Sequence, residues 1–172
     1  MNIPLVMTII GRDRPGLVEM VARIVAAHGG NWLESRMCHL GGEFAGILRV
    51  HVPAGNEPAL VQALRELDHQ GLTIVPHPDC GPETTLSKTI ASLELVGQDR
   101  PGIVRHIAGV LANHKVNVEE LSSECATAPM SGEMLFKARA ILHVPDDCNM
   151  AELRHDLEKI AADLMVDISF SN

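Results

Sequence analysis

The sequence predicts an α+β protein built from two ferredoxin-like βαββαβ domains in tandem. Each domain is expected to have a four-stranded antiparallel sheet with two helices on one face. Residues 11–16 (GRDRPG) recur 86 residues later as residues 97–102 (GQDRPG), each time after an apolar run and before an amphipathic segment. In both halves the segments follow the order strand, helix, strand, strand, helix, strand, which is the split βαβ arrangement.

The first half fits this order element by element. Residues 3–10 are apolar and β-branched, which is typical of a buried strand. The next segment places apolar side chains on one helical face: Leu17, Met20, Val21, Ile24 and Val25. Glycines end this helix and then join two strands, expected at residues 31–40 and 44–52. Asn56 is expected to cap a second helix, and a last strand is expected at residues 72–75.

The second half repeats the pattern. Its first helix has an apolar face formed by Ile103, Ile107, Val110 and Leu111, and its second strand opens at Asn117, again at an offset of 86. Its third strand lies at an offset of 92, because residues 126–132 replace the short glycine turn. Asn149 and Glu152 have the spacing of a helix cap. We therefore expect domains at residues 1–78 and 87–172, joined by a Pro- and Gly-rich linker at 79–86.

Composition excludes several classes of function. The net charge of the 172 residues is −8, and no basic run stands out, which argues against direct binding of nucleic acid. No apolar run reaches the roughly 20 residues that span a bilayer, and no secretion signal opens the chain, so we expect a cytoplasmic protein without membrane contact. The four cysteines lack the paired spacing of zinc sites, so neither a metal nor a cofactor is expected.

The repeated turn combines residue types that suit the start of a helix. Its first glycine permits a sharp turn, Asp13 and Asp99 are expected to cap the helices, and Pro15 and Pro101 suit a first helical position. The last glycine of each turn leaves the backbone open to another group. Unpaired amides and the helix dipole would attract a carboxylate there. A capped turn with no ligand is the structural alternative.

Asp-Arg-Pro-Gly after a first strand, with Asn opening the second strand, resembles the ACT domain family over nearly the whole chain. The resemblance implies small-molecule sensing, often of amino acids, between the first strand, the first helix and the start of the second strand. Helix-start amides would hold the ligand carboxylate and polar side chains its amino group. Many relatives that bind amino acids carry Asn where this chain has the two aspartates. The matching positions are Asp13, Gly16, Leu17 and Asn31 in the first repeat, and Asp99, Gly102, Ile103 and Asn117 in the second.

These features favour a regulatory protein that senses a small amino acid, such as glycine, and acts on a DNA-binding transcription factor through protein contact. Two alternatives remain open, an interaction module without a ligand and a regulatory subunit of an amino-acid metabolic enzyme. An enzyme is not expected, because no catalytic Ser-His-Asp order, nucleophile elbow or phosphate loop is present. An open sheet edge would allow a homodimer. Cys38, Cys125 and His106 are expected to serve packing.

Overall fold

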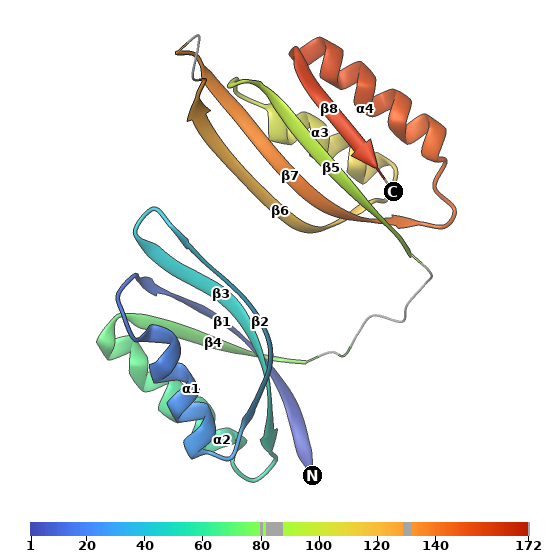
Figure 1. The fold of residues 1–172 in the computed structure, drawn as a ribbon. Coiled ribbons are helices and arrows are strands. Elements are labelled where there is room, and N and C mark those ends of the chain that lie inside the picture. The colour runs from blue at the N-terminus through green and yellow to red at the C-terminus, as the bar shows by residue number, and fades with distance from the viewer. Residues whose placement is uncertain (80, 82–87, 129–131, 172) are drawn as a thin grey trace. The chain divides into compact units, whose positions relative to one another are not determined.

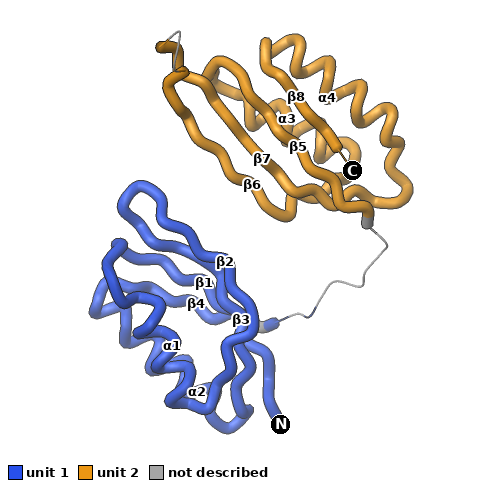
Figure 2. Tube along the Cα trace, viewed as in Figure 1, with its two compact units in different colours: residues 1–83 blue, residues 84–172 orange. Residues whose placement is uncertain are grey.

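The computed structural model describes residues 1–79, 81, 88–128 and 132–171 and divides the chain into two compact units, residues 1–83 and 84–172 (Figure 2). Most of the linker expected at residues 79–86 lies outside the described residues. Part of the long hairpin turn expected at residues 126–132 lies outside them too.

Unit 1 is a four-stranded antiparallel sheet in the order β2-β3-β1-β4, with its helices on one face (Figure 1). Its elements are β1 (Asn2–Arg12), α1 (Leu17–Ala27), β2 (Asn31–Leu40), β3 (Glu43–Pro53), α2 (Glu57–Arg65), the 3-10 helix η1 (Glu66–Gln70) and β4 (Leu72–Pro78). The edge strand β2 has a bulge near its start, between Trp32 and Glu34. The predicted fold class and element order are confirmed for this half.

Unit 2 has the same architecture, with strand order β6-β7-β5-β8. Its elements are β5 (Lys88–Gln98), α3 (Ile103–Asn113), β6 (Asn117–Thr127), β7 (Met134–Pro145), α4 (Met150–Leu164) and β8 (Val166–Ser171). The bulge recurs in the edge strand, between Val118 and Glu120. The sequence repeat is therefore a repeat of the whole fold.

Each unit has its own aliphatic core between the sheet and the helices. In unit 1 the core joins inward residues of β1 and β3, such as Met7 and Leu48, to Val21 of α1 and Leu60 of α2. The predicted helical faces are confirmed, since Leu17, Val21 and Val25 are buried. Among the described residues, all those that are buried as a whole are hydrophobic. Hydrophobic burial is therefore the main stabilising term for both units.

The helix starts differ from the predicted caps. The residues that precede α1 and α3 are Gly16 and Gly102, with φ values of 93° and 96°, and neither helix has a side-chain cap. The prediction that Asp13 and Asp99 cap these helices was wrong. The prolines precede the capping glycine rather than occupy the first helical position. The left-handed backbone of each glycine decides where the helix begins, because few other residues adopt that conformation.

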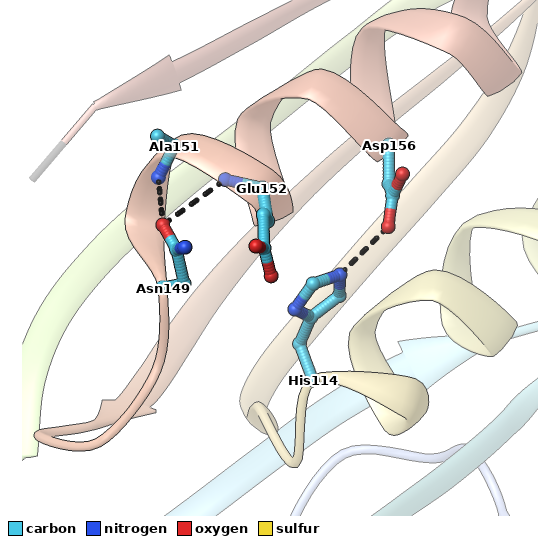
Figure 3. Close-up of polar contacts among 5 residues, drawn as sticks. All are labelled: His114, Asn149, Ala151, Glu152 and Asp156. Atoms are coloured by element: carbon cyan, nitrogen blue, oxygen red, sulfur yellow. Dashed lines mark hydrogen bonds and ion pairs between the residues drawn. The ribbon is translucent and has the colours of Figure 1, made fainter.

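The two asparagines expected at helix starts also differ from each other. The Asn149 side-chain oxygen accepts hydrogen bonds from the backbone amides of Ala151 and Glu152, at 3.1 and 3.3 Å (Figure 3), so this cap is confirmed. Asn56 precedes α2, but its side chain does not cap the helix and instead donates to the carbonyl oxygen of His28 at 2.9 Å. That bond ties the end of α1 to the start of α2.

Candidate functional site

The start of α1 and the start of α3 each form a corner at which the first backbone amides of the helix have no partner within the helix. The first intrahelical bonds join the amide of Met20 to the Gly16 carbonyl (2.9 Å) and the amide of His106 to the Gly102 carbonyl (3.0 Å). The amides of the three residues before Met20 and before His106 therefore lack a partner one turn earlier in the helix. Such amides, with the positive end of the helix dipole, form an environment that favours anions.

An aspartate lies beside each helix start and faces the end of the edge strand. In unit 1 the backbone amide of Asp13 donates to the Gly42 carbonyl at 2.9 Å, and Oδ2 lies 3.7 Å from Nε2 of His39. In unit 2 the amide of Asp99 donates to the Met134 carbonyl at 3.0 Å, and its carboxylate interacts with the Cys125 thiol. His39 and Cys125 are equivalent positions, 86 residues apart. The acid is thus held in the same place in both units.

The cysteines differ from their expected packing role. Cys38 and Cys125 are both exposed, because they lie on edge strands that no further strand covers. Desolvation, followed by the charge of Asp99 and a hydrogen bond to it, raises the pKa of the Cys125 thiol. Desolvation and then the charges of Asp147 and Glu152 raise the pKa of Cys148. A redox-active thiol needs a lowered pKa, so both environments oppose that role.

The structure brings together some of the predicted site residues but not all. Asp13, Gly16 and Leu17 meet at the α1 corner, and their counterparts Asp99, Gly102 and Ile103 meet at the α3 corner. Asn31 is paired with His51, whereas Asp13 is bonded to Gly42 at the other end of β3. His51 and Gly42, the partners of Asn31 and Asp13, are nine residues apart along the chain, which is about 30 Å at the usual rise per residue of a strand. Asn117 likewise pairs with His143, far from Asp99 along the sheet.

The two corners differ in the free space beside the glycine that precedes the helix. A Cβ built on Gly16 would meet no atom within 4 Å, whereas one built on Gly102 would lie 3.2–3.3 Å from the imidazole of His106. The expectation that His106 packs against the core was wrong. It is exposed, and its Nδ1 donates to the Gly102 carbonyl oxygen at 2.7 Å. Its counterpart in unit 1 is Met20, which packs against the core.

The two corners also differ in charge. The first turn of α1 contains Glu19, whose carboxylate lies 3.8 Å from Arg23, whereas the first turn of α3 contains no acidic residue and has Arg105 at the equivalent position. The α3 corner is therefore the more favourable one for a carboxylate. Sequence reasoning missed His39, Arg105 and His106. Aligning the two repeats at the offset of 86 would have revealed these positions, since each aligns with a residue of different chemistry in the other repeat.

Two βαββαβ units in tandem, each with an aspartate beside a helix start, define a duplicated small-domain protein of the ferredoxin-like class. ACT domain models match residues 4–76 and 91–146, and the chain belongs to the ACT domain family. This confirms the family resemblance seen in the sequence.

Individual relatives match at lower identity. The glycine cleavage system transcriptional repressor of Escherichia coli is 23% identical over 163 residues, which covers 93% of this chain and 85% of the relative. A UPF0237 protein of Methanopyrus kandleri is 34% identical over 80 residues, covering 46% of this chain and 83% of the relative. One solved structure, described as an unknown protein from Galdieria sulphuraria, aligns with a TM-score of 0.85 and 27% sequence identity. The alignment covers 99% of this chain and 98% of that chain.

The described residues contain no group of three or more His, Cys, Asp or Glu side chains that could hold a metal ion. Within the same part of the chain, none of the helices combines the length and apolar character that crossing a membrane requires.

Proposed function

We propose that this protein is a regulatory amino-acid sensor of the cytoplasm that acts on transcription through contact with a DNA-binding protein partner. Membership of the ACT family and similarity to a transcriptional repressor support the regulatory, sensing part of this role. The net charge of −8 supports action through a protein rather than through DNA. The repressor relative makes glycine the first amino acid to test.

The observation that carries the proposal is the repeated corner, where an aspartate precedes a helix start whose first amides have no partner within the helix. An amino acid would place its own carboxylate against the amides before Met20 or His106. Its ammonium group would lie against Asp13 or Asp99. Charge-assisted hydrogen bonds of this kind are about twice as strong as neutral ones. Both ends of a zwitterion are thereby matched without a metal or cofactor.

A second copy of the chain would account for Asn31. β2 is an edge strand with most of its residues exposed. Antiparallel pairing of β2 with β2 of a second copy would bring the Asn31 end of one strand beside the Leu40 end of the other, and thus near the Asp13 corner. We therefore propose a homodimer through β2, with Asn31 completing the corner of the other copy.

Isothermal titration calorimetry of the full chain with a panel of amino acids, glycine first, tests the proposal. We expect saturable heat with at least one amino acid and a matching rise in melting temperature, because a ligand that binds only the folded state stabilises it. Capture of a transcription factor from native lysate should then change when that amino acid is added. Absence of heat and of thermal shift with every member of the panel would contradict sensing and favour an interaction module without a ligand.

Exchanging the charges in the first helical turns should alter affinity in opposite directions. Arg105→Glu is expected to weaken binding at the α3 corner about tenfold, and Glu19→Arg to strengthen binding at the α1 corner by a similar factor. Each substitution changes the charge by two units where single charges contribute about 0.3–1 kcal/mol. Lys159→Glu, an exposed charge reversal in α4, serves as the control. Identical affinities in all three variants would show that the ligand carboxylate does not bind at a helix start.

A further inference from the structure

Unit 2 contains an open apolar groove between α3 and the edge strand β6. Its cavity volume is about 50 Å³, and its walls are almost entirely hydrocarbon. Three aliphatic side chains at its rim remain substantially exposed: Val104 (46%), Val118 (39%) and Leu121 (56%). Exposed apolar surface that forms one continuous patch commonly marks a binding site.

Comparison with unit 1 explains why the groove is open. Trp32, Met37 and Leu48 of unit 1 correspond to Val118, Ser123 and Ala140 of unit 2, so three large side chains are replaced by smaller ones. Trp32 and Met37 are partly buried and pack against the core of their own unit, while Leu48 is fully buried. One change runs the other way, since Leu121 at the groove rim stands where unit 1 has Ser35. Unit 1 thus covers this part of its own sheet with Trp32 and Met37, and unit 2 has no side chains of that size at those two positions.

Gly46 of β3, which stands opposite Met37 of β2, bears on the same comparison. A Cβ built on Gly46 would overlap the backbone oxygen of Arg36 and would lie 2.6 Å from Cγ of Met37, so both the β2 backbone and the Met37 side chain occupy the space beside Gly46. At the corresponding pair in unit 2, Ala138 stands opposite Ser123. The α3–β6 groove therefore has room for part of an apolar side chain from outside the unit.

The strand beside the groove has an open edge. β6 lies at the end of its sheet, and all but one of its residues are exposed. The bulge near Val118 disturbs only its start, which leaves residues 120–127 in regular pairing with β7. An unpaired edge of this length presents backbone donors and acceptors to an added strand. Side chains at alternate positions of that strand would lie over the groove.

The charges on β6 indicate which kind of added strand could pair with it. The strand has three glutamates, at positions 119, 120 and 124, and no lysine, arginine or histidine. Glu119 lies 3.5 Å from His143, and Lys137 stands opposite Glu124 on the inner neighbour β7. Two copies of β6 side by side would bring together six glutamates and no basic residue, and like charges are unfavourable across strands. A segment with basic residues is complementary instead.

We propose that the α3–β6 groove and the β6 edge form the docking site for an extended, basic segment of a partner protein. The segment adds a strand to β6, lays an aliphatic side chain over the groove and places Lys or Arg on the helix-free face beside Glu124. The inference rests on the proposed regulatory role only for the existence of a partner.

The test uses the full chain and a blocked eight-residue peptide of alternating leucine and lysine, with a leucine–glutamate peptide as its charge control. We expect the lysine peptide to bind, more weakly at higher salt, and to slow amide hydrogen exchange in β6. The glutamate peptide should bind at least tenfold more weakly. No binding of the lysine peptide, or equal binding of both peptides, would overturn the proposal.

Two matched valines locate the site. Val104→Arg places a cation at the rim of the groove and should weaken binding of the lysine peptide at least tenfold. Val18→Arg changes the equivalent position of α1, which is 47% exposed, and should have no effect. Val118→Trp should fill the groove as Trp32 does in unit 1 and also reduce binding. Equal effects of the two arginine variants, or unchanged exchange in β6, would contradict this site. Amino-acid binding, measured separately by calorimetry, distinguishes this failure from failure of the sensor role.

Discussion

Replacing Gly11 with alanine is expected to destabilise unit 1 by about 3 kcal/mol, because the added methyl group overpacks a tightly closed site. A Cβ built at this position overlaps the backbone oxygen of Gly71 and lies 3.0–3.1 Å from atoms of Leu72. A backbone oxygen cannot move aside as the end of a flexible side chain can. The start of β4 would therefore have to shift away from β1, to which it is hydrogen-bonded.

The single tryptophan allows the unfolding of unit 1 to be measured separately from the unfolding of unit 2. Trp32 lies in unit 1 and packs against its core, so tryptophan fluorescence reports the unfolding of that unit alone. Circular dichroism reports both units. In Gly11→Ala the fluorescence transition should move to lower denaturant concentration, while a second transition seen by circular dichroism stays in place.

Gly109→Ala is the matched control. Gly109 lies inside α3, and a Cβ there meets no atom within 4 Å. Alanine should therefore stabilise unit 2 by about 0.5–1 kcal/mol and leave the tryptophan signal unchanged. An unchanged fluorescence transition in Gly11→Ala would contradict the close approach of β1 and β4.

Gly11 also illustrates what the sequence could and could not predict. The repeat at offsets of 86 and 92 was enough to predict both folds, because alternation and helical faces recur in the same order. The motif was interpreted as a set of turn and capping residues, yet Gly11 provides space and Gly16 provides the left-handed backbone. Distinguishing those roles requires knowing that β4 returns beside β1, which is a contact between residues far apart in sequence.

The candidate site was predicted in part for the same reason. Residues adjacent in sequence, such as Asp13 and Gly16, meet at one corner. Asn31 does not, because α1 carries the chain back to the far end of the sheet before β2 begins at Asn31. The exposure of Cys125 follows from the edge position of β6, which depends on strand order rather than on residue type.

Removing the acid at each corner should have the largest effect on ligand affinity. Asp99→Ala and Asp13→Ala are each expected to weaken amino-acid binding at their own corner at least thirty-fold, or about 2 kcal/mol. Loss of one partner of a charge pair leaves the ligand ammonium without its counter-ion. Asp163→Ala, at an exposed position of α4, should leave affinity unchanged. Titration calorimetry of the three variants measures the difference.

A second measurement checks that the Asp99 variant has lost a charge and not the fold. Asp99 contributes to the raised pKa of Cys125, so its removal should lower that pKa and increase the thiolate fraction at pH 8. Site-resolved alkylation of Cys125 should therefore become faster in Asp99→Ala, with Cys148 unchanged. Faster alkylation together with unaltered amino-acid affinity would mean that the carboxylate beside α3 takes no part in binding. Faster alkylation together with lost affinity would assign the ammonium of the ligand to Asp99.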